Sequence, residues 1–357
     1  MAYSILAASI SIFLGLALAE FNVWSHVMLA GYYAGLLFPM SVYINFYTAA
    51  ASGAPRPPRE YIPLLLALIL ATAAPIPGST IMLAMLFLLS QVALLYYMAL
   101  QAEKIRRNTL TRIAALAPPV SGILASLALL YSDVSSLFEA IMILVLAFST
   151  PVPLLMAPTA VGASIYGLGP VQGRESIIRL SPALLAVAAS IPTVFTMSVK
   201  PYLIPLLIYL FVMRPWRPAS SLLKPGLKAP QAYLLSVHIA TLAAIATILF
   251  IAGDRDIVEA GHAIMIGVIA PHALLHSLVR GGEIPFTRRP RSWTPIPPLL
   301  LAASTPLRLV SREASLALAL LALAVHAASL LDPHPKNIVP RAFRVERRAA
   351  SPVVLGE

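Results

Sequence analysis

The sequence predicts an all-α, polytopic integral membrane protein, built as a helical bundle of about twelve transmembrane helices. Three observations point to this class: 59% of the 357 residues are hydrophobic, only 11% are charged, and the mean hydropathy is +0.85. A soluble domain carries about 25% charged residues and is less than half apolar. The composition therefore excludes a soluble globular protein.

Hydrophobic stretches follow one another along most of the chain. The first has no preceding Lys or Arg and no small-residue cleavage site, so we expect a retained helix rather than a signal peptide. Prolines, 32 in number, suit kinked or broken membrane helices, and the sixth stretch carries Pro151, Pro153 and Pro158. The expected spans are about 2–20, 23–50, 61–77, 79–102, 112–131, 135–160, 182–198, 201–213, 231–252, 257–279, 295–309 and 313–331.

The basic residues predict the orientation. Most of the 25 Lys and Arg residues fall in connections that follow even-numbered stretches, or in the C-terminal tail. The positive-inside rule places that side in the cytoplasm. We therefore expect a cell-membrane protein with a transmembrane domain at 1–331, a basic tail at 332–357, and both termini cytoplasmic. The net charge of +11 belongs to these loops and the tail, so the expected partner is the lipid bilayer and no nucleic acid is expected.

Histidine is the titratable residue that the predicted spans contain. The chain has no cysteine, which excludes disulfides, thiolate metal sites and iron–sulfur clusters. Of its seven histidines, all but His334 fall in predicted spans, where Asp, Glu, Lys and Arg are scarce. Ionisable groups inside a membrane usually mark a site or a cavity, and neutral imidazole is the commonest metal ligand. Each histidine taken alone has an equally good simple interpretation, a hydrogen bond to a neighbouring group.

The tenth stretch carries three of these histidines on one predicted face. At about 100° per residue, His272 and His276 lie within an arc of about 80° from His262, and Arg280 returns to the same direction. Pro271 is expected to perturb this phase in the inner half of the helix.

Depth in the membrane pairs His262 with a histidine of the second stretch. His26 lies about one turn below the outer surface and His262 lies at nearly the same level. Two imidazoles at one depth can bind a haem iron axially or share a copper ion. Glu259 is placed to orient the His262 ring, and Met265 is a further possible ligand for Cu(I). The cations predicted on the outer side, which would be near enough to meet haem propionates, are Lys200, Arg255, Arg308 and Arg312.

A second group of histidines lies toward the cytoplasmic side. It would form a second metal site or a proton relay, or its members would be separately hydrogen-bonded. Its members are His238, His272, His276 and His326.

Two segments resemble motifs of the NnrS family of haem- and copper-containing membrane proteins. The run from Trp24 to Tyr32, WSHVMLAGY, resembles that family's early WHxHxMLxGF-type motif. The run from His262 to Ile269, HAIMIGVI, resembles its later HALTxGxI-type motif, which an Arg follows, here Arg280.

The resemblance implies a respiratory-membrane protein that binds haem b, copper or both and is concerned with nitric oxide or nitrosative stress. It implies that the cofactor contacts include His26, His262, Gly31, Gly267 and Arg280. Gly31 and Gly267 also have a simple interpretation, because small residues let neighbouring helices pack closely.

Two other functions fit the same sequence. A secondary transporter would suit about twelve spans with both termini inside and broken helices, with histidines serving proton coupling. An assembly subunit without chemistry of its own is the third. Whether the protein is an enzyme, and which oligomer it forms, are not decided by the sequence.

Overall fold

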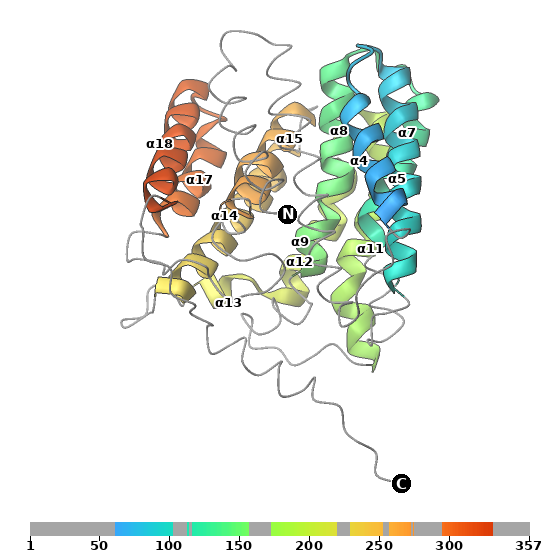
Figure 1. The fold of residues 1–357 in the computed structure, drawn as a ribbon. Coiled ribbons are helices and arrows are strands. Elements are labelled where there is room, and N and C mark those ends of the chain that lie inside the picture. The colour runs from blue at the N-terminus through green and yellow to red at the C-terminus, as the bar shows by residue number, and fades with distance from the viewer. Residues whose placement is uncertain are drawn as a thin grey trace.

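The computed structural model describes residues 61–102, 113, 116–156, 173–219, 229–252, 257–272, 274 and 295–330. Every regular element in these residues is helical, so the expected all-α class is confirmed for this part of the chain (Figure 1). His26 and Gly31 in the second predicted span lie outside the described residues, as do His276, Arg280 and the tail at 332–357.

The helices coincide with the predicted hydrophobic stretches from the third to the twelfth, and a short helix, α13, lies between the eighth and the ninth. In chain order the elements are α4 (Tyr61–Ala73), α5 (Thr80–Ala102), α7 (Ala117–Leu130), α8 (Leu137–Ser149), α9 (Pro151–Met156), α11 (Gly173–Thr196), η3 (Lys200–Tyr202), α12 (Leu203–Met213), α13 (Trp216–Ala219), α14 (Ala229–Ile251), α15 (Ile257–Ile264), η5 (Met265–Ile269), α17 (Ile296–Leu307) and α18 (Arg312–Leu330).

Three segments of the described chain are long and apolar enough to cross a membrane. They are Thr80–Leu100 in α5, Leu137–Leu155 in α8 and α9, and Ile177–Thr196 in α11, with 21, 19 and 20 residues. About 20 residues of helix span the hydrocarbon core of a bilayer. Large apolar side chains are also exposed on outward faces; Phe211, for example, is 75% exposed and Phe250 is 81% exposed. These features indicate membrane association, and the number of twelve spans stays a prediction.

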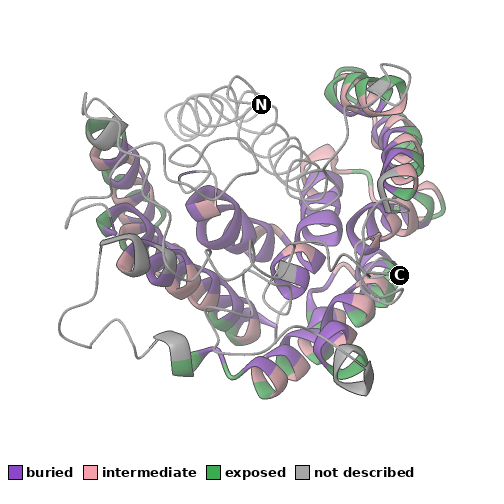
Figure 2. Cartoon of the chain, turned by 60° about the horizontal axis from the view of Figure 1, so that its bottom comes forward, coloured by how far each residue is buried: buried purple, intermediate pink, exposed green. Residues whose placement is uncertain are grey.

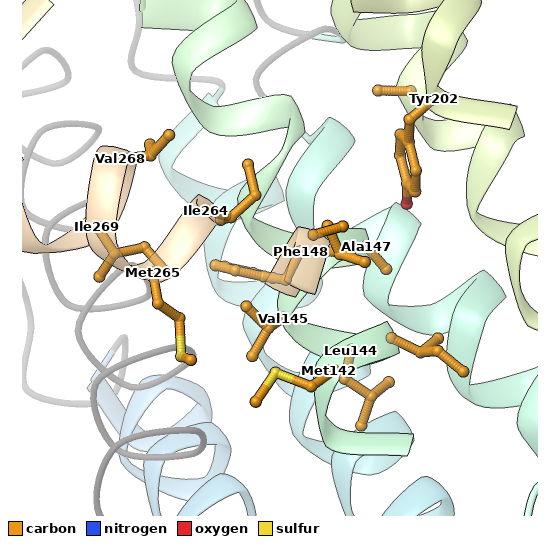
Figure 3. Packing of buried hydrophobic residues seen from close by; sticks show 14 of the residues in the cluster. Met142, Leu144, Val145, Ala147, Phe148, Tyr202, Ile264, Met265, Val268 and Ile269 are labelled. Carbon is orange, nitrogen blue, oxygen red and sulfur yellow. The ribbon is translucent and has the colours of Figure 1, made fainter. Parts of the chain in front are cut away.

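Two helical segments form the centre of the described bundle. All residues of α8 from Ala140 to Ser149 are buried, as are all residues from Ala260 through the end of η5. The inner helices are accordingly purple in Figure 2, whereas outer helices carry green on their outward sides. α8 packs on α15, α7 and α11, while α14 and α17 pack on η5. Figure 3 shows Phe148 of α8 and Ile264 of α15 in this shared core.

The sixth predicted span is interrupted where its prolines begin. Ser136 caps the start of α8 by accepting a hydrogen bond from the Glu139 amide at 3.4 Å. α8 ends at Ser149, and Pro151 begins α9, a position where the missing proline N–H is not needed. Thr150 between them keeps helical angles, with φ −63° and ψ −43°, so the prolines interrupt the hydrogen-bond ladder while the segment continues in one direction.

The seventh helix begins earlier than the stretch predicted at 182–198 and includes two arginines. α11 starts at Gly173, so Arg174 and Arg179 belong to the helix rather than to the preceding connection. Arg179 is only 8% exposed and lies within the apolar segment. The aliphatic stem of an arginine is readily buried along an apolar surface. A rule that assigns every arginine to a connection because of its charge does not take this into account.

Two glycines permit close helix approach in the tenth stretch. A Cβ on Gly267 would lie 2.7 Å from Cβ of Ala244 and 2.9 Å from the carbonyl oxygen of Ala240, both in α14. A Cβ on Gly261 would lie 2.6 Å from Sδ of Met142 in α8. The first obstacle includes rigid backbone, whereas the second is the far end of a flexible side chain.

We expect Gly267→Ala to destabilise the protein by about 1–3 kcal/mol, because two packed helices must separate to admit the methyl group. Gly261→Ala is the matched control; its cost should be smaller, since Met142 has several rotatable bonds. The measurement is thermal unfolding of the detergent-solubilised variants. Equal melting temperatures for the two variants would contradict the close contact at Gly267.

Candidate functional site

His262 is the described histidine with the most central position. It lies in α15, is 4% exposed, and faces the Phe138 ring of α8 at a centroid distance of 6.1 Å. Its Nδ1 lies 2.7 Å from the carbonyl oxygen of Val258, one turn earlier in the same helix. A carbonyl oxygen only accepts, so Nδ1 carries the proton and, in the neutral ring, the lone pair is on Nε2. A metal-ligating histidine has this arrangement, with the second ring nitrogen fixed by a backbone carbonyl.

Glu259 does not orient His262, which corrects the expectation from the sequence. Its carboxylate accepts a hydrogen bond from Nε of Arg308 at 2.6 Å and is 3.4 Å from Nη2 of Arg312. The His262 ring is held by the Val258 carbonyl instead. Glu259, Arg308 and Arg312, here called the Glu259 clasp, thus tie the start of α15 to the turn between α17 and α18.

The Glu259 clasp also changes the expected role of the outer cations. Arg308 pairs with this carboxylate at 2.6 Å and is only 17% exposed, so it is not available simply as a propionate-binding charge, whereas Arg312 is 69% exposed and its contact is long. The clasp could have been anticipated from the sequence: a Glu at the start of the tenth stretch and two Arg between the eleventh and twelfth stretches share one side of the alternating topology. Its assembly here agrees with the order of those three predicted stretches.

A π-helical turn separates His262 from His272. η5 covers Met265–Ile269, and the amide of Ala270 donates to the carbonyl oxygen of Met265, five residues earlier. A π-turn accommodates one additional residue, which rotates the following helix by about 100° relative to an ideal α-helix. His272 therefore does not share the narrow stripe predicted for it with His262. Pro271, which lacks an amide donor, follows directly and accounts for a perturbed ladder at this place.

His238 and His272 come together from two different elements. Nε2 of His238, in α14, donates to the carbonyl oxygen of Pro215 between α12 and α13, at 3.0 Å. Nδ1 of His272 donates to the carbonyl oxygen of Val268 at 2.6 Å. α14 packs on α15 and η5, so these two members of the predicted inner group lie on neighbouring elements.

His326 is not brought to this pair. It is 4% exposed in α18, which packs on α17 at one edge of the described helices (Figure 1). Among the described residues, no group of three or more His, Asp or Glu side chains is arranged to hold a metal ion. The simple interpretation, a hydrogen bond to a backbone carbonyl, holds for His238, His262 and His272.

Gly267 and Met265 serve packing in the described structure. The open face of Gly267 is filled by α14 and by the Thr305 hydroxyl of α17, whose oxygen would lie 3.0 Å from an added Cβ. That face is therefore not available to a flat cofactor, which corrects the role that the resemblance implied for Gly267. Met265 is 8% exposed and belongs to the apolar core (Figure 3).

Comparisons with known proteins add no relative: no family model, no curated protein and no solved structure matches the chain.

The Glu259 clasp gives a testable expectation for stability. Glu259→Gln should destabilise the protein by about 1–3 kcal/mol, because Arg308 is only 17% exposed and loses its charged partner. Arg312→Gln is the control, since that side chain is 69% exposed and its contact is long. It should cost under about 1 kcal/mol. Thermal unfolding at low and high salt measures both; a wild-type melting temperature for Glu259→Gln would refute the clasp.

Proposed function

We propose that the protein is a multi-pass membrane protein, similar to the NnrS family, that binds haem or copper through His262. In this proposal Nε2 of His262 is the ligand atom, and His26 of the second predicted span supplies the opposing imidazole. A haem iron or copper ion would supply reversible binding of a small gas such as nitric oxide, or one-electron transfer in the respiratory membrane.

The observation that carries the proposal is the fixed tautomer of a buried histidine. Nδ1 of His262 donates to the Val258 carbonyl at 2.7 Å, so the Nε2 lone pair is directed away from its own helix backbone. The ring lies against Phe138 and between buried apolar residues of α15 and α8. An apolar shell limits water access and tunes the potential of a bound metal. These features suit a ligand to a haem iron or a copper ion.

His238 and His272 support a second proposal, for metal binding or proton transfer nearer the cytoplasmic side. Each ring uses one nitrogen on a backbone carbonyl, which leaves Nδ1 of His238 and Nε2 of His272 as the nitrogens with lone pairs. In the proposal these two rings either bind a copper ion with His276 or pass protons toward the cytoplasmic side.

A proton-coupled transporter is the alternative that a specific observation favours. Two of the buried central segments are irregular: the hydrogen-bond ladder is interrupted between α8 and α9 at Pro151, and η5 interrupts the helix that carries His262 and His272. Broken helices at the centre of a bundle are typical of substrate sites in secondary transporters. The cofactor experiment separates the two proposals, because a transporter of this kind needs neither haem nor copper.

We expect the full-length protein, expressed with haem and copper supplied and purified in detergent, to contain metal and absorb visible light. His262→Gln should abolish or shift the absorption, because a weakly ligating amide replaces the imidazole that would hold the metal. His326→Gln is the matched control: it has the same 4% exposure but lies in α18, away from the other described histidines. Visible spectra with and without nitric oxide, together with metal analysis, measure the effect.

A colourless, metal-free preparation would overturn the cofactor proposal and favour the transporter. An unchanged spectrum and metal content in folded His262→Gln would overturn the role of His262. Elution as a single species in gel filtration shows that each variant is folded.

The proposed orientation, with both termini in the cytoplasm, can be tested separately. Because the chain has no cysteine, one introduced thiol is a unique target for a membrane-impermeant maleimide. Val310→Cys, in the turn after α17 where Val310 is 85% exposed, should react in sealed right-side-out vesicles. Arg217→Cys, in α13, should react only after permeabilisation. Labelling of both from the same side would contradict the proposed alternation.

A further inference from the structure

One face of α12 is apolar and exposed along its length. Ile204, Leu207 and Phe211 are 63%, 43% and 75% exposed. Their spacing places them on the same side of the helix. Apolar side chains exposed in this way suit contact with the acyl chains of lipids. The face ends at Phe211, and α13 follows near the lower end of the described bundle (Figure 1).

A tight turn with two cations comes directly after this face. The amide of Arg217 donates to the carbonyl oxygen of Arg214 at 3.0 Å, which brings the two Cα atoms within about 7 Å of each other. Both arginines are exposed, and Trp216 between them is 53% exposed. Two guanidinium groups and an indole therefore lie on one small exposed surface. Residues 214–217 are here called the arginine turn.

Buried contacts hold the arginine turn in place. Pro215 is buried, and Nε2 of His238 in α14 donates to its carbonyl oxygen at 3.0 Å. The Arg214 amide donates to the carbonyl oxygen of Leu210 at 3.0 Å and so caps α12. Arg214 has φ 47° and ψ 55°, a left-handed conformation that glycine adopts most easily. An arginine at this position therefore offers a charge and no backbone advantage.

The charges along this part of the chain are positive. The sequence from 176 to 253 contains no Asp or Glu, and the connection after α12 carries Lys224 and Lys228 besides the two arginines. A guanidinium group binds phosphate oxygens through paired N–H donors. Tryptophan favours the level of the lipid headgroups in a bilayer. A phosphate group at the membrane surface is thus the anion that complements the arginine turn.

We propose that the arginine turn binds the headgroup of an anionic phospholipid, whose acyl chains lie along the exposed face of α12. Arg214 and Arg217 hold the phosphate, and Trp216 lies at the level of the headgroups. This end of α12 is predicted to face the cytoplasm, where the leaflet is rich in anionic lipid. A soluble phosphate ion would use neither the tryptophan nor the apolar face beside it. The lipid site does not depend on the proposed cofactor.

Fluorescence quenching by brominated lipids tests the proposal. The full-length protein is reconstituted in vesicles of phosphatidylcholine and phosphatidylglycerol in equal amounts, with bromine on the acyl chains of one lipid or of the other. Bromine quenches an indole that lies near it. The chain has three tryptophans, so the Trp216 signal is the difference between the wild-type protein and Trp216→Phe. We expect brominated phosphatidylglycerol to quench this signal several-fold more than brominated phosphatidylcholine.

The arginines are tested by substitution in the same vesicles. Arg214→Gln combined with Arg217→Gln should make the two lipids quench equally, because the phosphate loses both cations. Lys200→Gln is the matched control, since it removes an exposed cation at the opposite end of α12 and should leave the preference unchanged. Gel filtration in detergent shows that each variant is folded.

Equal quenching by the two lipids in the wild-type protein would overturn the proposal and indicate an ordinary interfacial tryptophan. A preference that persists in the folded double variant would overturn the role of the arginines. Loss of the preference when inorganic phosphate replaces chloride at the same ionic strength would overturn the lipid assignment in favour of a soluble anion. The comparison of the two lipids needs no arginine variant, so it decides the question even where the double variant does not fold.

Discussion

The packing of α8 against α15 is the interaction on which the rest of the described structure depends. Together with α7 and α11, α15 buries α8 at ten consecutive positions from Ala140 to Ser149, and the contact with α15 brings Phe138 to the ring of His262. Gly261 lies in this contact, where an added Cβ would lie 2.6 Å from Sδ of Met142, a side chain with several rotatable bonds. Inside a bilayer the hydrophobic effect does not drive helices together. Close packing at small residues holds them together instead. The position of His262 therefore follows from the packing of α8 against α15.

Burial determines which hydrogen bonds the histidine rings make, and hence their tautomers. A ring removed from water must place its N–H on an acceptor, and helix backbone carbonyls are the nearest acceptors. His262 and His272 solve this in the same way, each donating from Nδ1 to the carbonyl four residues earlier. The bond satisfies the ring and also selects its tautomer. The simple structural role and the proposed ligand role are therefore compatible, because they use different nitrogens of one imidazole.

The sequence predicted the elements well and their mutual geometry poorly, for physical reasons. Hydrophobic length predicts a helix wherever about 15 apolar residues occur together, and the interruption at Pro151 follows from a missing N–H. Pro271 predicted a perturbed helix in the tenth stretch, but the position of the π-turn at Met265–Ile269, before the proline, could not be read from that residue. Arg308 meets Glu259 across 49 positions of sequence, so spacing along one helix assigned Glu259 to the wrong partner. The inner histidines were grouped by depth, with separate hydrogen bonds as the alternative, and the bonds of His238 and His272 to backbone carbonyls fit that alternative.

The neighbours of the tenth stretch restrict where a second ligand for His262 can approach. α8 contacts α15 on the Gly261 side, and α14 and α17 contact η5 on the Gly267 side. On a helix, His262 points about 100° from Gly261, so an opposing imidazole has to arrive from a direction between these two packed faces. The Gly267 face is filled by α14 and Thr305, so in the cofactor proposal the metal would be held through Nε2 of His262. The cofactor proposal therefore requires His26, and with it the second predicted span, to approach His262 from that direction.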